Sequence, residues 1–255
     1  MKQELIKKVI KVGNSAGVIL PLNWINGRAR VELIEKPSDI KKEIFEILDE
    51  YLENIKGIYI AGSYARGEEE DRSDIDVLVV TNNINKRIDI GRYNIILMAE
   101  EDVRENLSRN IIPLLPMLKE AKSILNSALL ETLKKVKLSA ENTKIALELA
   151  DSALEVNKKF IELARENGWK LGDAIAYSLI LNLRIVYTID CLKAGKVCKK
   201  SQLVSLAKKI SGSGNAYEGY LRVKDGKKRM DELFVSEAER LYDYVSSRVK
   251  RLKNG

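Results

Sequence analysis

The sequence predicts a mixed α/β core with a small β element before it and a helical bundle after it. Residues 57–98 contain short runs rich in β-branched residues, and turns separate these runs. From about Ser139 onward, apolar residues recur every three to four positions, which is typical of amphipathic helices. The formal charge divides along similar lines, with +4 over residues 1–37, −6 over 38–126 and +9 over 127–255. We therefore expect three domains with these boundaries.

The amino-acid composition limits which residues can act as bases or metal ligands, and it indicates where the protein is located. The chain has 255 residues, of which 45% are hydrophobic and none is His. The absence of His excludes it as a general base and as a metal ligand. Cys191 and Cys198 do not have the spacing of zinc ligands, so we interpret them as reduced thiols. With no run of 18 apolar residues and no signal-peptide pattern, we expect a cytoplasmic protein without membrane contact. Abundant Lys and Glu, with Gln only at Gln3 and Gln202, favour a thermophilic source.

The first 37 residues have the pattern of a small β element. Residues 5–12 and 18–21 resemble strands around a turn at 13–17, a helical turn follows at 22–26, and residues 29–35 alternate like a third strand. A segment this short does not bury a core alone. It therefore needs either the next domain or a second copy of itself.

One stretch of this element, KVGNSAGVILPLNWINGRARVELIE, resembles the AbrB/MazE-type swapped-hairpin DNA-binding family. The resemblance implies a homodimer whose basic loops meet DNA. By the same resemblance, Lys11, Asn14, Ser15 and Arg28 are the candidates for contacts with phosphates. The alternative is a β appendage that packs on the central domain.

The central region alternates helices and strands. An amphipathic helix is expected over residues 38–53, with Ser38 or Asp39 as its N-cap. The elements expected after it are a buried strand at 57–61, a short helix at 64–70, strands at 75–81, 87–90 and 93–98, a helix at 100–109, and, after Pro113 and Pro116, a helical stretch and an apolar run at 123–125.

The C-terminal region is expected to be a helical bundle. The predicted helices cover residues 139–167, 173–194 and 201–210, and a last helix begins at a capping box of Ser236 and Glu239. Ser139 is the expected N-cap of the first helix, and Gly168 is expected to end it.

The chemistry is concentrated in residues 62–80, GSYARGEEEDRSDIDVLVV. Gly62 leaves the backbone open to a phosphate, and Ser63 offers a hydroxyl and an amide at a helix start. Asp74 and Asp76 are two apart at the start of a strand, so both carboxylates lie on one side and can share hard metal ions. A lone Asp-x-Asp is weak evidence, but here it lies between two predicted buried strands.

The spacing of Gly62-Ser63, ten residues and Asp74-Ile75-Asp76 resembles the minimal nucleotidyltransferases of the DNA polymerase β superfamily. This resemblance implies transfer of a nucleoside monophosphate, most simply AMP from ATP, to a hydroxyl acceptor with Mg²⁺. Arg66, one helical turn after Ser63, is then a candidate for a phosphate contact.

The family normally adds a third carboxylate from a later strand, and this sequence departs from that pattern. The aligned position is Asn94, and an amide is a poorer metal ligand and no base. Asp89 on the preceding strand is an alternative, as are Glu100 and Glu101, although both have the pattern of residues in a helix start. The chain is therefore either an active transferase or a protein that only binds nucleotide.

The sequence leaves two classes of function open, a transferase and a DNA-binding regulator. The acceptor of a transferase would be a protein, an RNA or a small molecule. The competing class is a DNA-binding regulator of antitoxin or mobile-element type. In residues 216–229, tyrosines alternate with cations, which suits either nucleic acid stacking or an ordinary helix face. Glu218 or Asp173 could supply a base to the cleft.

Overall fold

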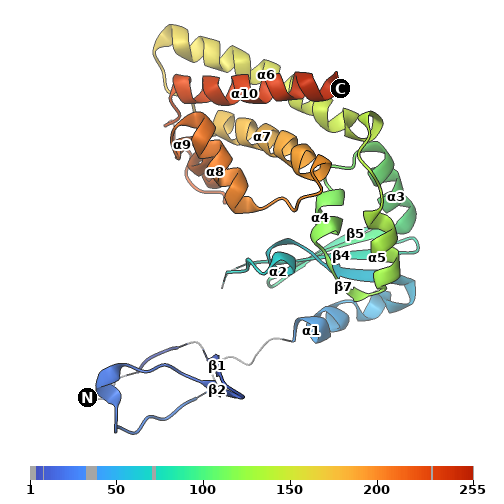
Figure 1. Cartoon of the computed structure of the whole chain (residues 1–255), viewed down its shortest axis with the longest axis vertical. Helices are drawn as coiled ribbons and strands as arrows, with labels where there is room; N and C mark the ends of the chain where they lie inside the picture. Colours follow the sequence, from blue (N-terminus) through green and yellow to red (C-terminus); the bar gives the residue numbers. More distant parts are fainter. Residues whose placement is uncertain (1–3, 8, 33–38, 71–72, 231, 255) are drawn as a thin grey trace. The chain divides into compact units, whose positions relative to one another are not determined.

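The computed structural model describes residues 4–7, 9–32, 39–70, 73–230 and 232–254. The chain divides into two compact units, Met1–Ile47 and Leu48–Gly255. The first contains a two-stranded sheet and one α-helix. The second is a mixed α/β fold that continues into a helical part (Figure 1), as the sequence predicts.

The N-terminal unit contains a two-residue hairpin. β1 (Ile10–Val12) pairs antiparallel with β2 (Ser15–Gly17), and Val12 lies opposite Ser15. The predicted turn is therefore too long, because Gly13 at φ +60° lets the chain reverse within two residues. The strand expected at 18–21 is absent, none is formed over 29–32, and 33–35 lie outside the described residues. The expected helical turn is a 3₁₀ turn, Leu22–Trp24.

The helix expected over 38–53 is divided. α1 (Ile40–Ile47) begins after Asp39, whose Oδ1 accepts a hydrogen bond from Lys42 N at 3.2 Å. A 3₁₀ helix, Asp49–Asn54, then starts with a tighter bond from Tyr51 N to Leu48 O. Of the two expected caps, Ser38 lies outside the described residues.

The second unit is built on a five-stranded mixed sheet with the order β5-β6-β4-β3-β7. Its strands are β3 (Ile55–Ile60), β4 (Ile75–Thr81), β5 (Lys86–Ile90), β6 (Tyr93–Ala99) and β7 (Lys122–Leu125). β4 and β6 are parallel, and the other neighbours are antiparallel. The buried run of β4 has side chains covered on both faces, as a central strand requires.

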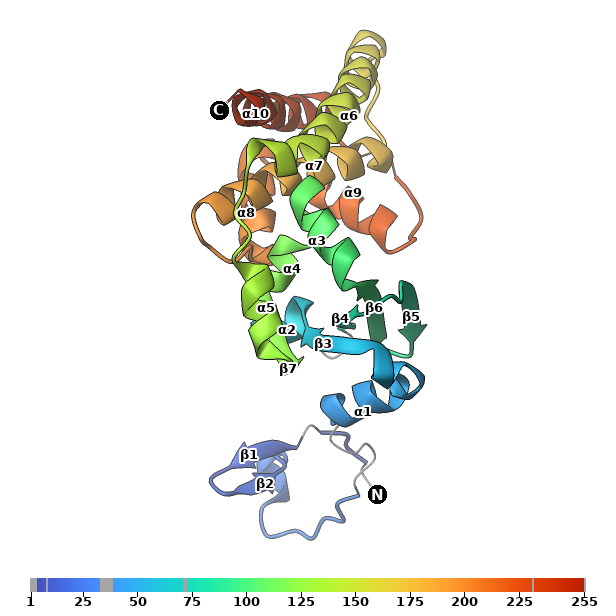
Figure 2. The ribbon, with the colours of Figure 1, turned by 90° about the vertical axis from the view of Figure 1, so that its right-hand side faces the viewer.

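Three helices cover one face of this sheet: α3 (Glu100–Arg109), α4 (Leu115–Glu120) and α5 (Ser127–Lys134) (Figure 2). Tyr59 and Leu78 of the sheet pack with Leu107, Leu118 and other apolar residues of these helices. This core fixes the sheet end where β3 finishes and β4 begins.

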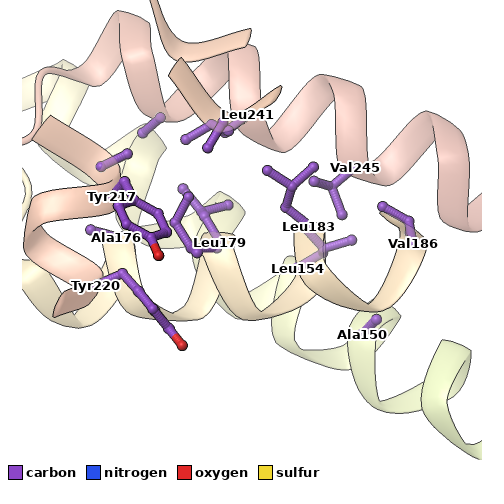
Figure 3. Packing of buried hydrophobic residues seen from close by; sticks show 14 of the residues in the cluster. Ala150, Leu154, Ala176, Leu179, Leu183, Val186, Tyr217, Tyr220, Leu241 and Val245 are labelled. Atoms are coloured by element: carbon purple, nitrogen blue, oxygen red, sulfur yellow. The ribbon is translucent and has the colours of Figure 1, made fainter. Parts of the chain in front are cut away.

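The helical part contains α6 (Ala140–Asn167), α7 (Asp173–Lys193), α8 (Lys200–Ser211), α9 (Asn215–Lys224) and α10 (Val235–Lys253). Figure 3 shows their shared core, with Leu154, Leu183 and Val245 contributed by different helices. Ile112 packs against both this core and the core of the sheet, which joins the two. α7 has the length and composition to cross a membrane, but half of its apolar window is buried inside the protein.

One expectation for the helix boundaries of the helical part is wrong. The predicted capping box of Ser236 and Glu239 does not form, because α10 begins at Val235 and Glu237 takes the third position. The Glu237 carboxylate accepts from Phe234 N at 3.3 Å, while Glu239 pairs with Arg165 of α6. At the start of α6, Ser139 is the N-cap and Gly168 ends the helix, as predicted, and Asn142 completes a capping box with Ser139.

Candidate active site

Gly62 and Asp76 meet at one end of the sheet. β3 and β4 are antiparallel, and Ala61 N donates to Asp76 O at 2.8 Å just after β3 ends. Gly62 has φ +66°, and a Cβ there would lie only 2.3 Å from Asp76 Oδ2. The position therefore requires glycine for a reason that the sequence does not show: the carboxylate of Asp76 fills the space of a side chain.

Gly62 also starts the short helix α2 (Gly62–Arg66). The helix was expected at 64–70, but Gly67 ends it early with φ +69°. Ser63 is half-buried in the first turn, and its carbonyl accepts from Gly67 N and from Glu68 N. Arg66 is the last residue of this helix.

The third-carboxylate position holds a hydrogen-bonded amide. The parallel register of β4 and β6 places Asn94 beside Asp76, and Asn94 Nδ2 donates to Asp76 Oδ1 at 3.0 Å. Asn94 Oδ1 is buried and has no hydrogen-bond partner. Asp74, one position before β4, is exposed.

Two carboxylates and one unpaired amide oxygen are hard oxygen donors of the kind that Mg²⁺ prefers. Within the described part of the chain, no cluster of three His, Cys, Asp or Glu has the arrangement to hold a metal. The donor set of Asp74, Asp76 and Asn94 Oδ1 therefore fits the ion only if water completes its coordination, which Mg²⁺ commonly retains.

The alternative third carboxylates lie at different distances from Asp76. Asp89 of β5 is opposite Asn94, so Asp76, Asn94 and Asp89 form one row across three strands. Two strand spacings separate the backbones of Asp76 and Asp89 by about 10 Å, and Asp89 is exposed and paired with Arg87 at 3.0 Å. Glu100 and Glu101 open α3 beyond the far end of β6, and Glu100 is bound by Lys56 and Arg104.

Arg66 is held by a carboxylate that the sequence analysis did not identify. Glu120 of α4 accepts from Gly62 N through Oε1 at 3.0 Å and from Arg66 Nη1 through Oε2 at 2.7 Å. Arg66 Nε also donates to Glu68. Burial lowers the pKa of Arg66, but the hydrogen bonds to Glu68 and Glu120 outweigh burial and raise its pKa above the ordinary value. Arg66 is therefore a cation, and an anionic group already occupies it.

Two further cationic side chains, those of Arg92 and Lys122, lie next to Tyr64 of α2. Arg92, in the turn between β5 and β6, donates from Nη1 to Tyr64 OH at 3.4 Å, and its carbonyl accepts from Ile75 N. Lys122 of β7 approaches Tyr64 O at 3.4 Å. No sequence motif marks Arg92, Lys122 or Glu120, because strand pairing and α4 bring them to this end of the sheet.

The tyrosines of the helical part that were considered for nucleic acid stacking are not on the surface. Tyr217 and Tyr220 are each 8% exposed, and Tyr220 stacks on Tyr177 with ring centroids 5.4 Å apart. They belong to the helical core, which favours the ordinary helix face over nucleic acid stacking. Glu218, one of the two suggested bases, is exposed on the same helix.

Asp173, the other suggested base, is 2% exposed and clamped. Both carboxylate oxygens accept from Arg222 at 2.8 Å, and Met230 N adds a third bond. The hydrogen bond from Arg222 holds the pKa of Asp173 below its ordinary value, although burial opposes it. A buried carboxylate with a lowered pKa and satisfied oxygens is a poor base.

The four candidate DNA contacts all belong to the N-terminal unit. Lys11 is on β1, Asn14 is in the turn, Ser15 opens β2 and Arg28 follows the 3₁₀ turn. All four are exposed.

One comparison with protein families supports a nucleotidyltransferase domain in part of the chain. A family model described as "Nucleotidyltransferase domain" matches residues 41–138, and no curated protein matches the chain. A nucleotidyltransferase-like protein from Exiguobacterium sibiricum is 14% identical, with a TM-score of 0.40 over 83% of this chain and 75% of that chain. Spectinomycin adenyltransferase AAD(9) from Enterococcus faecialis, solved with ATP and spectinomycin, is 16% identical, with a TM-score of 0.41 over 82% of this chain and 97% of that chain.

Proposed function

We propose that the protein is a nucleotidyltransferase that transfers a nucleoside monophosphate, AMP from ATP, to a hydroxyl acceptor. The observation that supports this most directly is the contact between Gly62 and Asp76, which joins the two halves of the Gly-Ser and Asp-x-Asp pattern. The match of the nucleotidyltransferase family model to residues 41–138 supports the same chemistry.

Mg²⁺ would be held by Asp74 and Asp76, with Asn94 Oδ1 as the additional oxygen. When bound, the ion offsets the negative charge of the phosphates and makes the α-phosphorus easier to attack. Asn94 holds the carboxylate of Asp76 in place through its amide hydrogen. An amide accepts no proton, so the remaining carboxylate chemistry falls to Asp74 and Asp76.

The reaction forms a bond between the acceptor oxygen and the α-phosphorus and breaks the bond between that phosphorus and the β-phosphate oxygen. Pyrophosphate leaves, and the acceptor proton passes to a carboxylate of the site or to water. Arg66, Arg92 and Lys122 supply positive charge for the leaving pyrophosphate, a type of stabilisation that contributes strongly to phosphoryl transfer. The acceptor is a protein, an RNA or a small molecule.

Release of pyrophosphate from ATP and Mg²⁺ in the presence of cell extract tests this function. We expect Asp74→Asn and Asp76→Asn to reduce the rate at least about 100-fold, because each removes a metal ligand. Asp225→Asn is the matched control and should leave the rate within about twofold, since Asp225 lies in the helical part, is exposed and is paired with Lys227. Equal rates in all three variants and the wild type would disprove the assignment.

Asn94→Asp provides a test in the opposite direction. It restores the carboxylate at the position that the family normally uses, and it replaces the amide donor of Asp76 with a second negative charge. We expect Mg²⁺ to raise the melting temperature of this variant more than that of the wild type, because the ion relieves the repulsion. A larger pyrophosphate rate should accompany the shift.

A second function that we propose is DNA binding by the N-terminal unit, and one observation supports the dimer that this function requires. Ten large apolar side chains of residues 4–32 are at least 37% exposed, among them Ile6, Leu22 and Val31. So much exposed apolar surface on a small unit favours a second copy as its cover. Such a dimer would carry two sets of Lys11 and Arg28. Light scattering should then give a dimer or larger species, and a monomeric full chain would remove this proposal.

A further inference from the structure

Helix α6 has two apolar faces, and the protein covers only one of them. The inner face includes Ala150, Leu154 and Ile161, which pack in the helical core (Figure 3 labels the first two). The ion pairs of α6 with α10, Lys253–Asp151 and Arg165–Glu239, lie on a different side of the helix from the second apolar face.

The second face is a stripe along the length of α6. At about 100° per residue, five large residues fall within about 60° of one another around the helix axis. Their side chains are between 41% and 63% exposed. These residues, which we call the α6 stripe, are Ile145, Leu149, Val156, Phe160 and Leu163.

Chance exposure does not account for this alignment. Single exposed apolar residues are normal on soluble proteins, but contiguous apolar surface marks an interaction site. From Ile145 to Leu163 the stripe extends about 27 Å, at 1.5 Å per residue. That length corresponds to a helix–helix contact of five turns, such as those in antiparallel bundles.

The pattern of residue sizes along the stripe matches a second copy of itself. Its two ends are large, with Ile145 and Leu149 at one and Phe160 and Leu163 at the other, and Ser152 lies near its middle. When two copies run antiparallel about the region of residues 152–156, Ile145 lies opposite Leu163 and Leu149 lies opposite Phe160. Large apolar side chains then meet in both halves of the contact, and the small Ser152 of each copy lies opposite Val156 of the other near its centre.

One pair of charges beside the stripe, Glu148 and Lys159, is complementary in the same register. Glu148 and Lys159 border the stripe on the same flank, and both are exposed. Eleven residues, or about 16 Å of helix, separate them within one chain. In the antiparallel pair, Glu148 of each copy lies opposite Lys159 of the other. At the two ends Glu141 comes near Glu166, where both remain at the rim in solvent.

We propose that the α6 stripe is a homodimer interface in which two α6 helices pair antiparallel. This interface is separate from the N-terminal unit, so it does not depend on the DNA-binding proposal or on transferase activity.

Sedimentation of the full chain tests the proposal directly. Leu149→Glu with Phe160→Glu places charges inside the apolar contact, which should raise the dissociation constant at least about 100-fold. We expect the mass to halve at a fixed protein concentration, from dimer to monomer or from tetramer to dimer if the N-terminal units also pair. Val197→Glu, which changes an apolar residue that is 45% exposed outside α6, is the matched control and should leave the mass unchanged.

A charge exchange tests the register. Glu148→Lys or Lys159→Glu alone places like charges opposite each other and should weaken the dimer about 3- to 10-fold. The combined variant, Glu148→Lys with Lys159→Glu, should restore it. Because the two positions are too far apart to interact within one helix, recovery identifies contact between copies. If the stripe variant keeps the mass of the wild type, the interface does not exist; if the combined variant adds the two losses, the antiparallel register is wrong.

Discussion

At the scale of single residues, position 62 requires glycine for two reasons, its backbone conformation and the lack of space for a side chain. Its φ of +66° is costly for other residues, and its missing side chain makes room for Asp76 Oδ2. We expect Gly62→Ala to lower the free energy of unfolding by about 2–4 kcal/mol, since the backbone and the clash both contribute. Displacement of the carboxylate should also weaken Mg²⁺-dependent ATP binding.

Gly67 provides the control for this prediction. It has φ +69°, but a Cβ there would meet nothing within 4 Å. Gly67→Ala should therefore cost only the backbone contribution, about 1–2 kcal/mol, and leave ATP binding unchanged. Urea unfolding measures both variants. Equal costs for Gly62→Ala and Gly67→Ala would show that Asp76 yields easily and does not determine the glycine.

A second prediction at this scale concerns Glu120. Its carboxylate holds Gly62 N and Arg66, the groups that a phosphate would use. Glu120→Gln keeps the size but removes the charge, so it should compete less well and improve ATP affinity about 3- to 10-fold. Glu68→Gln also frees Arg66 but does not touch Gly62 N, and should have a smaller effect. Weaker ATP binding by Glu120→Gln in calorimetry would instead make Glu120 a positioning residue of the site.

The sequence predicts only those contacts of the site that join residues close together in the chain. Gly62 and Asp76 follow and begin neighbouring strands, so their spacing is enough to predict that they meet. Glu120, by contrast, is far along the chain from Gly62 and arrives through α4 and the pairing of β7 with β3. No periodicity or motif encodes such a non-local contact.

At the scale of elements, boundaries could be predicted where one strong local signal acts. The apolar run of β4 and the acidic start of α3 gave the observed bounds, Ile75–Thr81 and Glu100–Arg109. Tertiary packing decided the others. For α9 the sequence left two interpretations open, nucleic acid stacking and an ordinary helix face. Tyr217 and Tyr220 are core residues and Arg222 is bound to Asp173, which agrees with the helix face.

The pair of Asp173 and Arg222 links α7 to α9 and makes stability depend on pH. The pKa of Asp173 is lower in the folded protein than in the unfolded chain, mainly through the hydrogen bond from Arg222. Its stabilisation is therefore complete above the unfolded pKa of about 3.9 and is lost as the pH falls through the folded value. We expect the melting temperature of the wild type to fall below about pH 4 for this reason.

Asp173→Asn separates this contribution from general acid unfolding. It should cost about 3–5 kcal/mol at pH 7, because Arg222 loses its buried partner, and it should flatten the pH dependence below pH 4. Asp225→Asn breaks an exposed pair with Lys227 and should change stability by no more than about 0.5 kcal/mol. Thermal unfolding from pH 3 to pH 7 compares them. An unchanged acid slope in Asp173→Asn would contradict the lowered pKa.

At the scale of the whole molecule, the chain has one candidate catalytic end and two candidate surfaces for self-association. The N-terminal unit exposes apolar residues over much of its described length, and the α6 stripe does so on the helical part. Because the catalytic residues lie on neither surface, assembly and nucleotide chemistry should respond to different substitutions. The sequence indicated the first surface, because the first 37 residues are too few to bury a core alone. It did not indicate the second, because only the structure shows which apolar residues of α6 are left uncovered.

DNA binding by the N-terminal unit would depend steeply on salt. Each phosphate that a Lys or Arg neutralises releases condensed counterions, so a dimer with roughly four to six contacts should give a log–log slope of about −4 to −5. Lys11→Ala with Arg28→Ala should flatten that slope by about 2 or more, because the dimer loses four cations. ATP binding should not change. Fluorescence anisotropy with duplex DNA across salt concentrations measures the slope, and the exposed pair Lys208→Ala with Lys209→Ala on α8 serves as the control. If the α8 variant flattens the slope and the N-terminal variant does not, the basic helical part holds the nucleic acid and the N-terminal assignment is wrong.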